Sequence, residues 1–201
     1  PGLSFREYLE MNGHIEKIKP ITLESIQKDA YSYIERVLNS INHPLPLFRD
    51  YLKTGYFPFS IGEKQESTLK KLNQVINTII ETDLAIIEAY DVKLAFKIKK
   101  LLGVIAESVP FKPNIASLAR KLEVSRESIY HWLSLLERAK LVNQLVAKGK
   151  GVSTLQKPDK LFLENPNWSY ALSQSPDIGN IRESFLLSQL VNVEFEVSLP
   201  K

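Results

Sequence analysis

Few residues of this 201-residue chain have the types and spacing that catalysis or metal binding requires. Cysteine is absent, which excludes a cysteine nucleophile, a thiolate zinc site and disulfide bonds. The histidines His14, His43 and His131 are far apart in sequence, and none has a partner at metal-ligand spacing. No Gly-x-Ser-x-Gly elbow occurs, and the nearest approach to a phosphate-binding loop, at residues 62–64, lacks the first glycine and the hydroxyl residue. The sequence therefore predicts no catalytic residue, metal ligand or cofactor within this chain.

The carboxylates are scattered singly along the sequence. Glu183, Glu194 and Glu196 could belong to a metal-dependent nuclease centre if more chain followed them. Within these residues that centre would be incomplete, so we expect no catalysis from it.

Phosphate binding is the chemistry that the charge distribution favours. Residues 96–160 contain 13 Lys and Arg and 5 Asp and Glu, a net charge of +8. The whole chain carries +3, which alone would not indicate nucleic acid, so the remaining residues carry −5. This concentration of positive charge is the footprint expected of a nucleic-acid-binding surface.

The positive segment contains a predicted helix-turn-helix over residues 114–141. Asn114 and Ser125 can cap its two helices, and residues 123–125 form the turn between them. Predicted strands at residues 141–146 and 160–163, joined by a turn at residues 148–151, would form the hairpin of a winged helix. The second helix would enter the major groove of double-stranded DNA. The candidate DNA-binding residues on that helix and on the wing are Arg126, Ser128, Tyr130, His131, Lys148 and Lys150.

A protein-binding role is the alternative interpretation of the same motif. Many winged helices contact other proteins, and Glu127 at the reading end of the second helix opposes phosphate. Only one arginine, Arg126, lies at that end. Contact with DNA and contact with protein both remain open at this point.

The elements around the motif predict a mainly α fold, a helical bundle followed by a winged helix-turn-helix with a small β-hairpin wing. Apolar residues recur at helical spacing in most segments before residue 108. We expect Gly55 to end a short helix in a left-handed conformation. Residues 165–175 should form a loop with one turn around Trp168 and Tyr170. No apolar run is long enough to span a membrane.

Six phrases along the chain carry a family resemblance. In order they are PGLSFREYLEM, FRDYLKTGYFPF, QVINTIIETDL, the stretch from residue 109 to 142, STLQKPDKLFLENPNWSYAL and DIGNIRESFLLSQL. Their order and spacing resemble the C-terminal region of bacterial and archaeal AAA-type P-loop ATPases. In that family an ATPase module precedes a helical region and a winged helix, and a segment related to restriction-endonuclease folds follows.

The resemblance implies three segments in a non-catalytic fragment of such an ATPase. Residues 1–108 would be the helical region, residues 109–165 the winged helix, and residues 166–201 the start of the endonuclease-like segment, with Glu183 near its acidic position. The start at Pro1 and the unpaired strand predicted at residues 193–199 also favour a fragment, although a trimmed mature chain is the alternative. The resemblance implies that ATP and Mg²⁺ bind the parent protein, that the missing module is a partner, and that the protein is cytoplasmic. Formation of a homo-oligomer is also possible.

Overall fold

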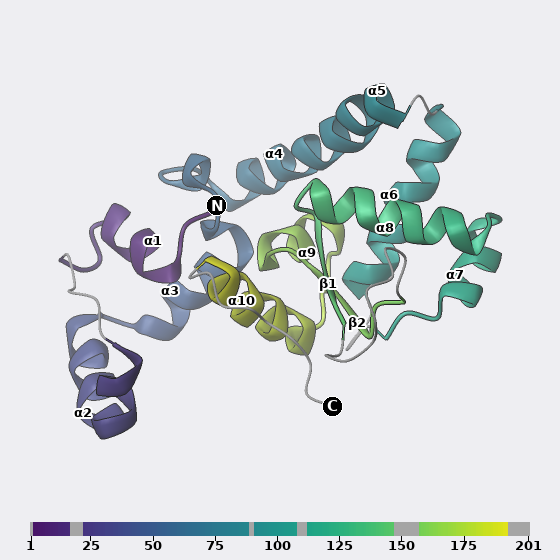
Figure 1. Cartoon of the computed structure of the whole chain (residues 1–201). Helices are drawn as coiled ribbons and strands as arrows, with labels where there is room; N and C mark the ends of the chain where they lie inside the picture. The colour runs from purple at the N-terminus through teal and green to yellow at the C-terminus, as the bar shows by residue number, and fades with distance from the viewer. Residues whose placement is uncertain (1, 17–21, 89–90, 108–111, 147–156, 193–201) are drawn as a thin grey trace. The chain divides into compact units, whose positions relative to one another are not determined.

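The computed structural model describes residues 2–16, 22–88, 91–107, 112–146 and 157–192 (Figure 1). They form two compact units, Pro1–Gln65 and Glu66–Lys201. The elements of the first unit are α1 (Phe5–Met11), α2 (Leu23–Ser40), α3 (Pro44–Asp50), a π-helix η1 (Tyr51–Gly55) and a 3₁₀ helix η2 (Pro58–Ser60).

Aromatic side chains form the core of the first unit. The rings of Phe5 and Phe48 meet edge to face with centroids 5.1 Å apart. Tyr51 is fully buried, and its hydroxyl donates a hydrogen bond of 2.7 Å to the carbonyl oxygen of Leu3. Burial of rings with satisfied polar ends contributes much of the stability of such a small core.

Gly55 differs from its predicted conformation. It is the last residue of the π-helix η1, and its φ is not positive. The predicted left-handed cap is therefore wrong. A Cβ atom at Gly55 would lie 2.8 Å from the rings of both Tyr8 and Tyr51. Glycine at this position therefore permits the close approach of two aromatic rings rather than a left-handed turn.

The second unit contains most of the helices and the only paired strands in the parts of the chain that are described. Its elements are α4 (Gln65–Thr78, which begins at the last residue of the first unit), a π-helix η3 (Ile79–Asp83), α5 (Leu84–Glu88), α6 (Val92–Glu107), α7 (Ile115–Leu122), α8 (Arg126–Arg138), β1 (Val142–Leu145), β2 (Lys160–Leu163), α9 (Pro166–Leu172) and α10 (Ile178–Asn192). Strands β1 and β2 are antiparallel, with Val142 opposite Leu163 and Leu145 opposite Lys160.

The helix α4 continues through η3 into α5. Leu72, Ile76, Ile80 and Leu84 are all buried, and they recur at every fourth residue along this rod. The π-helical turn η3 contains Ile80 and ends directly before Leu84, and its hydrogen bonds span five residues. The rod therefore presents one continuous apolar face to the rest of its unit.

Helix α9 is longer than the single turn expected around Trp168. Its cap, Asn165, accepts hydrogen bonds from the backbone N–H groups of Asn167 and Trp168, and Pro166 occupies the first helical turn. The Trp168 ring is buried and its Nε1 donates to the carbonyl oxygen of Lys140 at 3.3 Å. The ring thereby anchors the segment that follows the hairpin to the end of the helix-turn-helix.

The predicted fold class is confirmed: the chain is mainly α, with a helix-turn-helix followed by a β-hairpin. The two compact units divide at residue 65, whereas the prediction placed boundaries after residues 108 and 165, so the three-segment division stays a prediction. Among the described helices, none combines the length and apolar character needed to cross a bilayer.

Candidate nucleic-acid interface

The helix-turn-helix is fixed by the two predicted caps. Asn114 Oδ1 accepts from the backbone N–H of Ser117 at 3.0 Å, and Ser125 Oγ accepts from the N–H of Ser128 at 3.1 Å. Glu123 adopts φ 54° and ψ 54° at the turn. A short α7, a left-handed residue and an immediate second cap reverse the chain within three residues, as a helix-turn-helix requires.

Apolar faces hold α7 and α8 together. The buried residues of the two helices recur at helical spacing, and they are Ile115, Leu118, Ala119, Leu122, Ile129, Trp132, Leu133, Leu135 and Leu136. Small Ala119 faces this core, which permits close approach of the helix backbones. Because this apolar face of α8 is buried, the opposite face of the helix is exposed to solvent.

Three of the predicted DNA-binding residues lie near the start of α8. Arg126 is the first residue of the helix and is exposed, while Ser128 and Tyr130 are half-buried. The Ser128 hydroxyl lies 3.1 Å from the Ser125 hydroxyl, so the capping network already engages it. Lys148 and Lys150 lie outside the described residues.

His131 occupies a different environment from the one the sequence suggested. Its Nε2 lies 2.7 Å from Oε2 of Glu88, the last residue of α5. An acidic partner from another helix thus faces the middle of α8. This pairing competes with a phosphate or base contact by His131.

Glu127 adds negative charge at the same end of α8. Its own backbone N–H and then the Ser125 hydroxyl donate to the carboxylate, which holds the pKa of Glu127 below its usual value. The carboxylate therefore stays ionised at the helix N-terminus, where the helix dipole also favours it. Phosphate approaching this end meets Arg126 and Glu127 together.

Exposed cations gather around the turn instead. Lys97 Nζ of α6 donates to the backbone oxygen of Glu123 at 3.0 Å, so α6 runs beside the turn. One helical turn to either side of Lys97, Lys93 and Lys100 lie on the same face of α6. We call the following residues the basic surface: Lys93, Lys97, Lys100, Arg120, Lys121 and Arg126.

Sequence reasoning recognised the excess charge but did not select most of these residues. Arg120 and Lys121 end α7, directly before the turn, and both are exposed. Lys99, which also lies in the positive segment, forms an ion pair with Glu81 and is not part of the basic surface. The hydrogen bond from Lys97 to Glu123 joins residues 26 positions apart, so no local sequence pattern predicts it.

The carboxylates predicted for a nuclease centre do not form a cluster in the described residues. Glu183 of α10 pairs with Lys160 of β2, with Oε2 3.2 Å from Nζ. No group of three or more potential metal ligands occurs in the described ranges, which leave out Glu194 and Glu196. Glu183 therefore has a structural partner in the hairpin.

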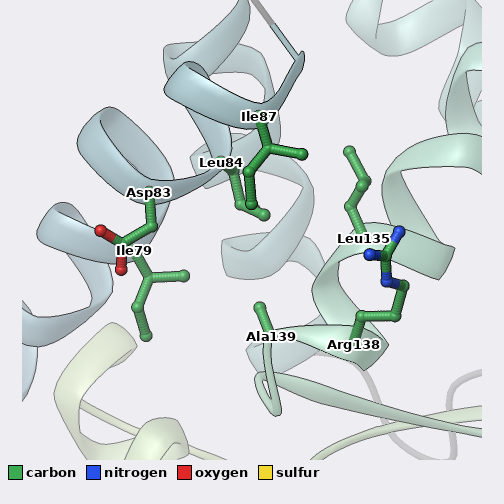
Figure 2. Close-up of a pocket in the computed structure, with 7 residues that line it drawn as sticks. All are labelled: Ile79, Asp83, Leu84, Ile87, Leu135, Arg138 and Ala139. Carbon is green, nitrogen blue, oxygen red and sulfur yellow. The ribbon is translucent and has the colours of Figure 1, made fainter.

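A cleft of about 270 Å³ lies between the η3–α5 segment and the end of α8 (Figure 2). It is lined by Ile79, Asp83, Leu84, Ile87, Leu135, Arg138 and Ala139. The Asp83 carboxylate and the Arg138 guanidinium lie at opposite sides of the apolar lining (Figure 2). Neither group has a hydrogen bond or ion pair to a residue in the described ranges.

The comparisons with known proteins give one family and one distant relative. Residues 45–174 match a family described as "Domain of unknown function (DUF8612)". The chain is 24% identical over 167 residues to "Uncharacterized protein MJ1637" of Methanocaldococcus jannaschii. That alignment covers 82% of this chain and 35% of the relative, so the chain spans about a third of the relative's length. No solved structure matches the chain, and neither match shows a link to AAA-type ATPases.

Proposed function

We propose that this chain, which belongs to the family of domains of unknown function DUF8612, binds double-stranded DNA through its winged helix-turn-helix. The observation that supports this is the basic surface. Lys97 of α6 contacts the turn between α7 and α8, Arg120, Lys121 and Arg126 flank that turn in the sequence, and Lys93 and Lys100 lie one helical turn to either side of Lys97. Glu123 and Glu127 are the acids at the turn and at the start of α8. Phosphate contacts supply most of the affinity of a protein that binds DNA without strong sequence preference.

The geometry favours contacts with the sugar–phosphate backbone over reading of base sequence. Of the candidate DNA-binding residues on α8, Arg126 and Tyr130 remain available, because Glu88 engages His131 and the cap engages Ser128. Arg126 is the one expected to contact either a guanine or a phosphate. A single guanidinium gives little discrimination between bases. We therefore expect modest sequence preference and strong dependence of affinity on salt.

Fluorescence anisotropy with a labelled duplex at 50 and 200 mM salt tests this function. Neutralising six phosphates predicts that affinity falls about 10³-fold across that interval. Replacement of Arg120 and Lys121 by glutamine should reduce the slope of log K against log salt by about 2, since each phosphate contact contributes about 0.9.

Lys70→Gln is the matched control, because Lys70 is exposed on α4 and pairs with Glu66 away from the turn. It should leave duplex affinity unchanged. Absence of duplex binding at 50 mM salt, or an equal effect of Lys70→Gln and the double variant, would contradict the proposal.

A second candidate function is contact with another protein through the cleft beside α8. Ile87 of α5 lines this cleft and is 63% exposed, which is high for isoleucine. The opposed charges of Asp83 and Arg138 would orient a partner segment whose apolar side chain fills the cleft. The proposed partner is the ATPase module of a AAA-type parent protein, in which ATP and Mg²⁺ would bind outside this chain.

The sequence resemblance supports this parent protein. Sedimentation velocity of the chain mixed with that module, with Ile87→Ser as the test variant, would measure the contact. Lack of association, or equal association by Ile87→Ser, would count against it. Sedimentation of the chain alone would test the predicted homo-oligomer.

A further inference from the structure

Helix α6 exposes an aromatic ring in the middle of its basic face. Phe96 is 67% exposed and Val92, one turn before it, is 83% exposed. Neither Phe96 nor Val92 belongs to the buried face of α6. That face consists of Ala95, Ile98, Leu101, Leu102, Ile105 and Ala106. Phe96 is therefore not required by the core of its unit.

Lysines surround this ring at helical neighbour positions. Lys93 lies three residues before Phe96 and Lys100 four residues after it, so both share its side of the helix. Lys97 follows directly and is fixed beside the α7–α8 turn by its hydrogen bond to Glu123. The aromatic ring and the cations thus form one surface that adjoins the start of α8.

Two of these lysines have no ion pair among the residues that the structure describes. Neither Lys93 nor Lys100 has an ion pair or hydrogen bond to a residue in the described parts of the chain, whereas neighbouring Lys99 pairs with Glu81. Lys97 donates to a carbonyl oxygen rather than a carboxylate. Within the described residues, the ammonium groups of Lys93 and Lys100 therefore have no anionic partner, and the Phe96 ring has no aromatic or cationic partner.

An unpaired nucleic-acid strand supplies both missing groups. Its phosphates are anions, and every base has an aromatic face that can stack on a phenylalanine regardless of sequence. A duplex offers the phosphates, but its bases are already stacked on one another. The combination of an exposed ring and spaced lysines fits a single strand better than a duplex.

We propose that the exposed face of α6 binds single-stranded DNA, with a base stacked on Phe96 and phosphates at Lys93, Lys97 and Lys100. This inference extends the proposed DNA-binding function to the strand next to the duplex. Because Lys97 lies beside the turn, the protein would bind a junction between double- and single-stranded DNA more tightly than either part alone.

Fluorescence anisotropy of the full chain with a labelled oligothymidylate at low salt tests the proposal. Phe96→Ala should weaken this binding about 5- to 150-fold, the range for loss of one stacked base. Phe96→Leu keeps an apolar side chain but has no ring, so it should weaken binding nearly as much. Phe96→Trp should retain or increase the affinity. Since Phe96 is exposed, these variants should keep the circular dichroism spectrum of the original chain.

The same variants separate this inference from the proposed function. Phe96→Ala should leave blunt-duplex affinity within about twofold, whereas the Arg120 and Lys121 double variant should lower it. Duplex binding without oligothymidylate binding would overturn the inference alone, and the reverse result would overturn the proposed function alone.

An apolar basic face also suits an anionic membrane surface or an acidic protein. Either partner would accept leucine at position 96 without loss, because neither requires a ring. Equal oligothymidylate binding by Phe96→Leu and the original chain would therefore overturn the proposal. So would cosedimentation with phosphatidylserine vesicles in the absence of oligothymidylate binding.

Discussion

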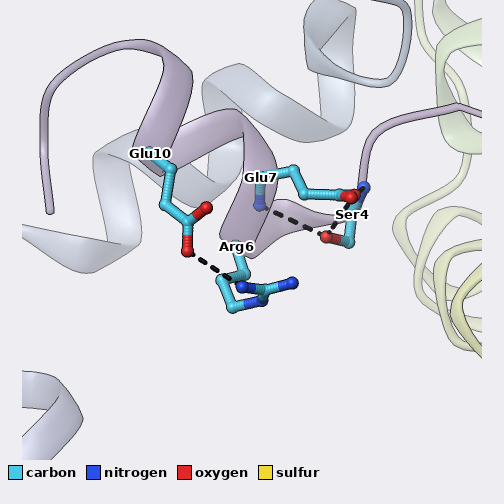
Figure 3. Close-up of polar contacts among 4 residues, drawn as sticks. All are labelled: Ser4, Arg6, Glu7 and Glu10. Atoms are coloured by element: carbon cyan, nitrogen blue, oxygen red, sulfur yellow. Dashed lines mark hydrogen bonds and ion pairs between the residues drawn. The ribbon is translucent and has the colours of Figure 1, made fainter. Parts of the chain in front are cut away.

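The helix α1 contains two glutamates with different contacts, Glu7 and Glu10 (Figure 3). We predict that Glu7 contributes more to the stability of the first unit than Glu10, which serves as the control. Glu7 accepts from the Ser4 backbone N–H at 2.8 Å and from the Ser4 hydroxyl at 2.7 Å. The Ser4 hydroxyl in turn accepts from the N–H of Glu7 at 3.2 Å, which completes a capping box. Glu10 instead forms an ion pair of 2.9 Å with Arg6, whose side chain is 44% exposed to solvent.

These contacts set the expected order of effects. Loss of a serine cap costs about 1 kcal/mol of unfolding free energy, so Ser4→Ala should lower the melting temperature of the 65-residue first unit by about 4–8 °C. Glu7→Gln should cost about half as much, because glutamine still accepts hydrogen bonds but without charge, and solvent screens this exposed site. Glu10→Gln removes the same charge from the same helix and should cost less than about 0.5 kcal/mol.

The effect of Glu7 should depend on pH. The hydrogen bonds from the side chain and then the backbone of Ser4 hold the pKa of Glu7 below 4.5 in the folded chain. A lowered folded pKa means that the stabilisation is fully present above the unfolded value and disappears as pH falls through the folded value. The difference between Glu7→Gln and the original chain should therefore vanish in acid.

Thermal unfolding measured by tyrosine circular dichroism from pH 7 downward would check this prediction. Both tryptophans, Trp132 and Trp168, lie in the second unit, so their fluorescence reports separately whether that unit stays folded. Equal destabilisation by Glu7→Gln and Glu10→Gln at pH 7 would refute the reasoning. A Glu7→Gln difference that persists below the folded pKa would refute it as well.

Three further predictions concern the second unit. Glu127→Gln should raise duplex affinity several-fold in the anisotropy assay, because it removes an ionised carboxylate beside Arg126; an unchanged affinity would place the start of α8 away from phosphate. Leu133→Ala should lower the unfolding free energy by about 2–5 kcal/mol in urea titrations, since Leu133 is fully buried and its truncation leaves a cavity; a loss below 1 kcal/mol would contradict this packing. Trp168→Phe should cost about 1 kcal/mol or more, because it removes the Nε1 hydrogen bond to Lys140 while keeping most of the apolar surface; an increase in melting temperature would contradict that role.

The helix-turn-helix was predictable because its signals are local. Asn114 and Ser125 each cap the helix that follows, and the apolar stripes lie within thirteen residues or fewer. The charge count indicated residues 96–160 as the positive segment of the chain. It could not distinguish Lys97, which borders the turn, from Lys99, which pairs with Glu81.

Contacts between distant segments account for the differences. His131 meets Glu88 across 43 residues, and spacing along the sequence gives no sign of that approach. Gly55 has the residue type of a helix end, yet the close approach of the Tyr51 ring in the same turn and of the Tyr8 ring from α1 explains it better. At Asn165 the asparagine–proline pair is a helix start signal, but it stands among turn-forming residues that suggested a loop.

The π-helical turn η3 changes the direction in which the side chains of α5 point relative to those of α4. In a plain α-helix, residues four apart advance by about 40° beyond a full turn, so a strict four-residue repeat spirals around the axis. Three such steps from Leu72 to Leu84 would displace the last side chain by about 120°. A π-helical turn contains an extra residue, so each residue of η3 rotates less about the axis than in an α-helix. This smaller rotation reduces the displacement and keeps Leu84 on the buried side. Deleting one residue between 79 and 83 would restore α-helical phasing and turn α5 about its axis, which would swing Ile87 away from the cleft and Glu88 away from His131.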